Sequence, residues 1–338
     1  MQLRRSTLIL ALAGAFVLVA SAAMAQTFKP TFLVSNISGK ALHTDPLLQN
    51  AWGLTYAPGG PFWVSDEADG WSTLYDGTGT PQSLQVIVPS SSGTGSGTPT
   101  GIVYNGSTEF KIQNWTSVFL FATLDGTISG WSSFEPSNAL IGVRATGSVY
   151  TGLAITSHTS GNFLYAADNA NNKVDVYDGN FNLVKSFNDN TIPAGFAPFG
   201  IQDISGQVYV TYASTSGAAG GYIDIFDESG NFVKHLVSSG HLNQPWGLAV
   251  APTTWGTFAG ALLVSNNNSK GTIVGFNLST GKIIGPLKNA TGNTVTINGL
   301  WGIEFGGGTT NNGGKNQLFF TAGPNDTNGF FGVINGHM

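Results

Sequence analysis

Residues 150–184, YTGLAITSHTSGNFLYAADNANNKVDVYDGNFNLV, decide the fold of this chain. They contain four short runs of apolar, β-branched or aromatic residues, and Gly, Asn, Asp or Ser residues bound each run. Such a pattern is typical of β-strands that are joined by tight turns. The stretch therefore predicts four strands, at 152–156, 162–168, 173–178 and, just beyond its end, 183–187.

The same four-strand unit recurs six times, and a Gly opens each predicted first strand. A period of about 40–50 residues with four strands per repeat is the sequence signature of a β-propeller. We therefore predict an all-β fold, a six-bladed β-propeller of four-stranded antiparallel blades that forms one domain over 26–338. The marker residues are Gly53, Gly101, Gly152, Gly200, Gly247 and Gly302, at spacings of 48, 51, 48, 47 and 55 residues.

The last repeat has only three predicted strands, and the segment that precedes the first repeat offers a fourth. This segment, TFLVS, begins at Thr31 and ends at Ser35, and it has no partner in its own neighbourhood. Closing the ring removes a free sheet edge, which is a site of unwanted pairing. We predict that this N-terminal strand completes the last blade.

The first 25 residues have the pattern of a secretory signal peptide. Arg4 and Arg5 form a positive start, 8–20 is apolar, and 23–25 (AMA) is a small-residue cleavage site. The apolar run is shorter than the roughly 20 residues that a membrane-spanning helix needs, and no later segment is apolar enough to span. We expect cleavage before Gln26 and a secreted protein, in the periplasm or the medium.

The composition excludes several kinds of partner and site. The chain has 13 basic and 18 acidic residues, a net charge of −5 and no cysteine. Nucleic acid and anionic membranes both require a basic surface, and a chain without cysteine forms no thiolate zinc or redox site. A chain of more than 300 residues can bury a hydrophobic core large enough to be stable without disulfides. We expect a monomer whose partner is a glycan or another protein.

The repeats resemble those of known propellers. In 165–178 (YAADNANNKVDVYD) a strand ends in Asp, an Asn-rich turn follows, and the next strand ends in an aromatic residue and Asp. This arrangement resembles the NHL repeat of six-bladed propellers. The segments 50–54 (NAWGL) and 62–66 (FWVSD) are similar to a family of exported bacterial propellers without assigned activity, some of which carry a PEP-type C-terminal sorting signal. The resemblance covers the whole mature chain, although this chain lacks the sorting signal. It implies a propeller fold and does not imply a particular reaction or ligand.

One face of the predicted propeller combines aromatic rings with Asn and Asp side chains. Aromatic faces beside planar amides and carboxylates are suited to binding sugars. The alternative is that the Trp rings pack between blades and that the Asp and Asn residues make turns. We predict a non-enzymatic binding module for a carbohydrate or another polar ligand. The candidate ligand-binding residues are Trp52, Phe199, Trp246, Trp301, Asp168, Asn169 and Asn266.

A metal-dependent hydrolase, lactonase or lyase is the alternative function. Asp66, Asp125 and Asp168 follow second strands, and if they converged on the axis their oxygens could bind Ca²⁺. The ion would then polarise a carbonyl or activate water. Propeller lactonases of the gluconolactonase type carry an acidic metal ligand just before the Gly of an early repeat. At that place this chain has 49–52 (QNAW), which contains no carboxylate, and this departure weakens the enzyme hypothesis. A structural protein of the cell envelope, with neither ligand nor metal, is the third possibility.

The histidines do not predict a zinc site. NHL-type lyases hold zinc with several histidines, whereas only His241 of this chain lies in a loop that leads to the predicted ligand face. One His is too few for a zinc site. The full set is His43, His158, His235, His241 and His337.

Overall fold

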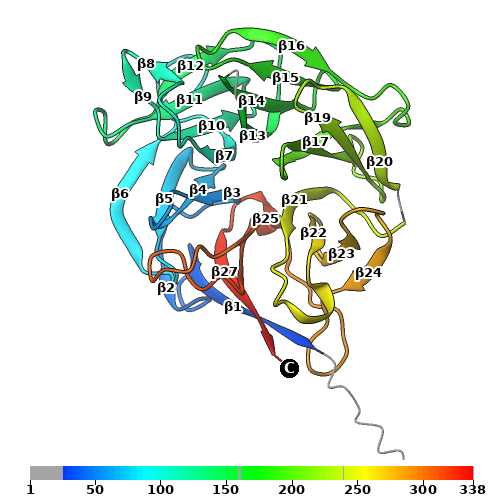
Figure 1. Ribbon diagram of the computed structural model, residues 1–338. Helices are drawn as coiled ribbons and strands as arrows, with labels where there is room; N and C mark the ends of the chain where they lie inside the picture. Colours follow the sequence, from blue (N-terminus) through cyan, green and yellow to red (C-terminus); the bar gives the residue numbers. More distant parts are fainter. Residues whose placement is uncertain (1–25, 159–160, 239, 338) are drawn as a thin grey trace, which may run out of the picture.

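Six β-sheets surround a central axis (Figure 1). The computed structural model describes residues 26–158, 161–238 and 240–337, and within them each sheet is an antiparallel blade of four main strands. The prediction of an all-β, six-bladed propeller is therefore confirmed. The predicted signal peptide, 1–25, lies outside the described residues.

Blades one to three follow the predicted strand pattern. In blade three the first strand is two residues longer at each end than predicted, because Tyr150 and His158 still pair with the second strand. Blade one consists of β3 (Ala51–Tyr56), β4 (Phe62–Asp66), β5 (Trp71–Tyr75) and β6 (Pro81–Ile87); blade two of β7 (Pro99–Tyr104), β10 (Phe119–Thr123), β11 (Thr127–Trp131) and β12 (Leu140–Arg144), with the small hairpin β8 (Lys111–Ile112) and β9 (Trp115–Thr116); and blade three of β13 (Tyr150–His158), β14 (Gly161–Asp168), β15 (Lys173–Tyr177) and β16 (Leu183–Phe187).

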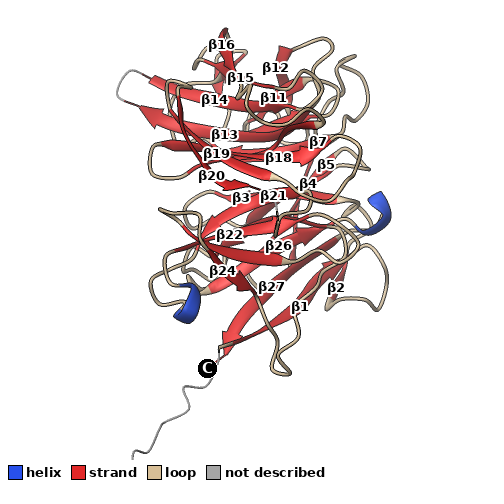
Figure 2. Cartoon of the chain, turned by 90° about the vertical axis from the view of Figure 1, so that its right-hand side faces the viewer, coloured by secondary structure: helices blue, strands red, loops and turns tan. Residues whose placement is uncertain are grey.

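Blades four to six repeat the same order, and the described residues contain two short helical turns, which lie in loops between strands (Figure 2). No helix among the described residues has the length and apolar character needed to cross a membrane. Blade four consists of β17 (Phe196–Asp203), β18 (Gln207–Ser214), β19 (Tyr222–Asp227) and β20 (Phe232–Ser238); blade five of β21 (Pro245–Val250), β22 (Ala261–Asn266), β23 (Ile273–Asn277) and β24 (Ile283–Pro286); blade six of β25 (Leu300–Phe305), β26 (Gln317–Ala322), β27 (Phe330–His337) and β1 (Thr27–Ser35), with β2 (His43–Thr44) at its edge; the turns are η1 (Gly256–Phe258) and η2 (Pro324–Asp326).

The N-terminal strand closes the ring, as predicted. β1 pairs antiparallel with β27 from Thr27 opposite His337 to Ser35 opposite Phe330, with an irregularity between Phe32 and Val34. In Figure 1 the two strands run side by side. The strand is longer than the predicted 31–35 because its first four residues continue the same ladder.

The first strands crowd around the axis, and their repeated Gly residues make this packing possible. A Cβ atom at Gly53 would lie 2.5 Å from the backbone oxygen of Thr100, and one at Gly247 would lie 2.7 Å from that of Trp301. Both distances are shorter than real Cβ contacts, so any side chain here would push neighbouring blades apart. The repeat Gly is therefore a steric requirement of the closed ring.

The hydrophobic core lies between neighbouring blades. Between blades three and four, for example, Tyr165 and Val174 pack with Val208 and Phe226, and all four are almost fully buried. One cluster of this kind fills each of the six interfaces between blades. The blades are thereby held as a ring, and the first strands form the wall of an axial cavity.

Candidate functional site: the axial cavity

Four aromatic side chains meet at one end of the axis. Trp52, Phe199, Trp246 and Trp301 each stand directly before a repeat Gly, so the symmetry of the ring brings them to the same level. The rings of Trp52 and Trp301 stack with centroids 3.7 Å apart, and Trp246 lies 6.1 and 5.9 Å from them in edge contacts. This Trp cluster closes the axis at the end where the first strands begin.

The Trp cluster presents little ring surface to a ligand. Trp52, Trp246 and Trp301 are only 6%, 9% and 5% exposed. The indole of Trp246 donates a hydrogen bond to the backbone oxygen of Thr151 at 2.8 Å, and that of Trp301 donates to Oδ1 of Asn50 at 3.2 Å. The structure therefore brings the predicted aromatic residues together, but in the packed arrangement that was the alternative to an open aromatic mouth.

The predicted polar partners of these rings fix loops. Asp168 is buried, and its Oδ1 accepts hydrogen bonds from the backbone amides of Val149 at 3.1 Å and Asn171 at 3.3 Å. The amide of Asn169 donates to the backbone oxygen of Pro198 at 2.9 Å. Asn266 accepts from the backbone amide of Asn243 at 2.8 Å and donates to the oxygen of His241 at 3.2 Å. Only the bond from Asn171 to Asp168 lies within one turn, and the others join loops that are far apart in the sequence.

The structure does not bring Asp66, Asp125 and Asp168, the predicted calcium ligands, into one cluster. These carboxylates belong to second strands or to the turns after them, one strand away from the axis. The described residues contain one group of three Asp, Glu or His side chains whose ligand atoms lie within 4.8 Å of one another, and none of the three carboxylates belongs to it. Asp125 instead accepts from the amide of Ser91 at 2.6 Å. Asp66 is fully buried without a hydrogen-bond partner among the described residues, and this burial raises its pKa well above the usual range.

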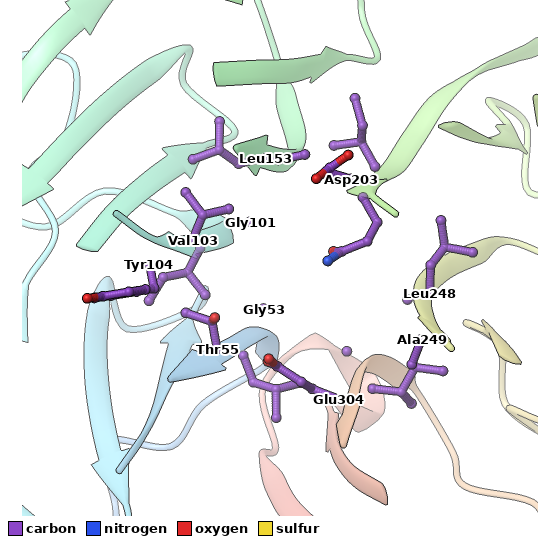
Figure 3. A pocket seen from close by; sticks show the side chains of 18 of the residues that line it. Gly53, Thr55, Gly101, Val103, Tyr104, Leu153, Asp203, Leu248, Ala249 and Glu304 are labelled. Atoms are coloured by element: carbon purple, nitrogen blue, oxygen red, sulfur yellow. The ribbon is translucent and has the colours of Figure 1, made fainter. Parts of the chain in front are cut away.

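An axial cavity of about 500 Å³ lies on the other side of the Trp cluster. First strands of all six blades line it, through the residues that follow each repeat Gly, and Figure 3 shows their side chains around the opening. The residue directly after the Gly is always Leu or Ile, which makes an apolar ring next to the Trp cluster. This ring consists of Leu54, Ile102, Leu153, Ile201, Leu248 and Ile303.

The next residue of each first strand gives the cavity its polar groups. Thr55, Gln202 and Glu304 occupy this level in three blades, and Val or Ala occupies it in the other three. In Figure 3 the side chains of Thr55 and Glu304 extend toward the centre of the cavity. One further residue along, Asp203 adds a second carboxyl at the rim. The cavity thus combines an aliphatic wall with a few polar groups that converge from different blades.

The pKa of Glu304 is strongly raised in the cavity. Burial raises its pKa to about 8, because the low-dielectric surroundings disfavour the charged form. Burial, with a smaller contribution from Glu304, also raises the pKa of Tyr56 to about 12, and the Tyr56 hydroxyl donates to the backbone oxygen of Phe305 at 3.0 Å. At neutral pH the Glu304 side chain is therefore mainly a carboxylic acid, which can donate one hydrogen bond and accept others.

Comparison with known proteins gives the relatives of this chain. No protein-family model matches the sequence. Over 320 residues the chain is 33% identical to uncharacterized protein R648 of Acanthamoeba polyphaga mimivirus, and the match covers 88% of this chain and 77% of the viral one. The chain belongs to the R648 family. Uncharacterized protein L690 of the same virus is 31% identical over 304 residues, with 82% and 78% of the two chains covered.

Solved structures share the fold of this R648-family chain. A catalytically inactive variant of virginiamycin B lyase from Staphylococcus aureus, determined with quinupristin, has a TM-score of 0.57 and 12% identity over 92% of this chain and 99% of that one. Gluconolactonase XC5397 from Xanthomonas campestris has a TM-score of 0.54 and 14% identity, with 85% and 88% covered. Identities this low establish the propeller fold alone. The finer resemblance to NHL repeats and to exported bacterial propellers stays a prediction.

Sequence reasoning missed the residues that converge in this R648-family cavity. Thr55, Gln202 and Glu304 each stand two residues after a repeat Gly, so the alignment of the six repeats already held the signal. At the same position the other repeats have Val or Ala, which makes the three polar residues stand out. His241, the only histidine expected near a ligand, is exposed in its loop, whereas His235 joins two carboxylates on blade four.

Proposed function

We propose that this protein is a non-enzymatic binding module that holds a small, uncharged, hydroxyl-rich ligand, such as a sugar, in the axial cavity. The observation that carries the proposal is the convergence of Thr55, Gln202 and Glu304 above an aliphatic ring, in a cavity of about 500 Å³. Ligand sites of proteins commonly occupy about 300–1,000 Å³ and combine an apolar wall with a few polar groups that orient the ligand.

The protonation of Glu304 favours an uncharged ligand. A carboxylic acid, an amide and a hydroxyl offer both donors and acceptors, and the hydroxyl groups of a sugar match both. The Leu and Ile side chains of the apolar ring are each at most 8% exposed, so they would add only a small apolar surface next to the ligand. Export from the cytoplasm, action as a monomer and the lack of a nucleic-acid partner remain parts of this proposal that rest on the sequence.

The lactonase-type function has less support. It needs a set of metal ligands at the axis. The group of three such ligands that the described residues contain lies away from the axis, on the outer strands of blade four and the connection before that blade. The lining of the axial cavity contains two carboxyl groups, that of Glu304 inside the cavity and that of Asp203 at its rim. The arrangement suits hydrogen bonding better than the activation of water.

Ligand-detected NMR with a panel of free monosaccharides and disaccharides tests the proposed binding. We expect at least one sugar to bind the native protein, and we expect Gln202→Leu and Thr55→Val to weaken that binding by about tenfold each, since a lost hydrogen bond to a buried partner costs about 1–1.5 kcal/mol. Asn169→Ala, in the turn after a second strand and outside the cavity lining, is the matched control and should bind normally. No binding by any sugar, or binding that only the control variant weakens, would refute the proposal.

Glu304→Gln tests the protonation state without changing the shape of the cavity. The pKa of Glu304 is raised from 4.5 to about 8 in the folded protein, so its contribution to stability is complete below pH 4.5 and is lost as the pH rises through 8. We expect the variant to melt several degrees above the native protein at pH 9 and within about one degree of it at pH 4. Thermal melts across this range measure the difference, and parallel curves at every pH would contradict the assignment.

A further inference from the structure

A second set of polar side chains gathers on the outer strands of blade four. Asp224 on β19 and His235 on β20 face each other in the register of the sheet. Asp189 joins them from the connection between blades three and four. One ligand atom from each of the three lies within 4.8 Å of the others, and the described residues contain no other such group of three.

The three side chains are held in a defined geometry. His235 Nδ1 lies 2.6 Å from Asp224 Oδ1, and its Nε2 lies 3.4 Å from Asp189 Oδ2. Oδ1 of Asp189 accepts hydrogen bonds from both the backbone amide and the hydroxyl of Thr191, each at 2.7 Å. These bonds orient the carboxylate so that its other oxygen faces the imidazole.

Buried oxygens in this cluster lack partners, and this observation points to a ligand. Oδ2 of Asp189 and Oδ2 of Asp224 accept no hydrogen bond from the described residues, although the two residues are only 7% and 0% exposed. The hydroxyl of Tyr212 is also buried, and its burial together with the nearby Asp224 and Asp189 raises its pKa. Unpaired buried oxygens are expensive.

Blade three shows how the same position is satisfied by protein groups alone. Asp175 occupies the place of Asp224 there, and Ser186 occupies the place of His235 in the register. Asp175 receives hydrogen bonds from Ser186 at 2.5 Å and from the Tyr150 hydroxyl at 2.9 Å, and Lys173 Nζ lies 2.8 Å away. In blade four the Asp instead has a His and a second carboxylate beside it, and both of these groups can also ligate a metal ion.

We propose that Asp189, Asp224 and His235 bind a divalent first-row transition-metal ion at the junction of blades three and four. Two carboxylates and an imidazole form a donor set that suits Zn²⁺ and its neighbours, whereas Ca²⁺ and Mg²⁺ prefer oxygen ligands alone. The His235 side chain is 39% exposed, so water can reach the ion and complete its coordination. On binding, Nε2 would exchange its 2.8 Å contact with the Thr191 hydroxyl for the ion. The ion would fix the connection that carries Asp189 onto the outer strands of blade four.

Calorimetry and thermal melts with Zn²⁺ alone, on the purified full protein freed of metal by chelator, test this site. We expect one Zn²⁺ per chain and a higher melting temperature, because an ion that binds only the folded state stabilises it. His235→Gln and Asp224→Asn should weaken binding by at least about tenfold, the loss seen even for outer partners of metal ligands. Ca²⁺ should bind far more weakly than Zn²⁺.

Two matched variants separate this site from other causes. His241→Gln removes an exposed His outside the cluster, and Asp175→Asn changes the corresponding Asp of blade three; both should bind Zn²⁺ normally. Should Asp224→Asn fail to fold, Asp189→Asn gives the same test from the connection between blades three and four. The proposal is overturned if Zn²⁺ does not bind, if it binds equally to His235→Gln, or if His235→Gln lowers the melting temperature equally with and without Zn²⁺.

Discussion

A chain that begins at Ile37 is expected to lose the folded propeller under conditions where a chain that begins at Gln26 is stable. The truncation removes β1 and leaves β27 as an open sheet edge. It also removes the buried side chains of Phe28, Leu33 and Val34. Burial of three such side chains contributes about 5–9 kcal/mol, which is comparable with the whole stability of a typical domain, about 5–15 kcal/mol.

Circular dichroism melts and gel filtration of the two chains measure the effect. The truncated chain should show no cooperative transition, or one far below that of the control, and it should associate through its free edge. A synthetic peptide of residues 26–36 should restore part of the lost stability when added in excess, because the ladder with β27 can re-form without a covalent link. A truncated chain that melts within a few degrees of the control would show that the ring does not depend on β1.

The fold could be predicted because its signal repeats. Gly53 and Gly247 recur at the same place in their repeats for one steric reason, which is the approach of neighbouring first strands to within Cβ contact. The strand that closes the ring was also predictable, because 31–35 is apolar and blade six lacked a fourth strand. Local alternation and turn residues carry this kind of information within a single sequence.

The candidate site was harder to predict, because a strand pattern does not give distance from the axis. Asp66 and Asp168 end second strands, so the ring holds them one strand away from the centre even though they look alike in each repeat. Glu304 is on a first strand and does reach the cavity, but its sequence neighbours show no catalytic motif. The cluster of Asp189 with His235 joins two blades, and no spacing rule connects them.

Trp301→Ala is expected to destabilise the protein by about 3–5 kcal/mol, the usual loss when a buried Trp is truncated. Its ring is 5% exposed and stacks on Trp52 with a centroid distance of 3.7 Å, so the truncation leaves a hole at the crowded end of the axis. It also removes the indole donor that binds Oδ1 of Asn50. Chemical denaturation followed by fluorescence and circular dichroism gives the free energy of unfolding.

Trp115→Ala is the matched control, since Trp115 is 49% exposed on the small hairpin of blade two. Because Trp115 stacks on Phe134 with ring centroids 4.5 Å apart, we expect its removal to cost about 0.5–1.5 kcal/mol, less than that of Trp301. A Trp301→Ala protein as stable as this control, but unable to bind the sugar that the native protein binds, would restore the aromatic mouth as the ligand site. A large loss of stability, with sugar binding retained by whatever fraction remains folded, would instead confirm that the Trp cluster seals the cavity and that the ligand binds on its other side.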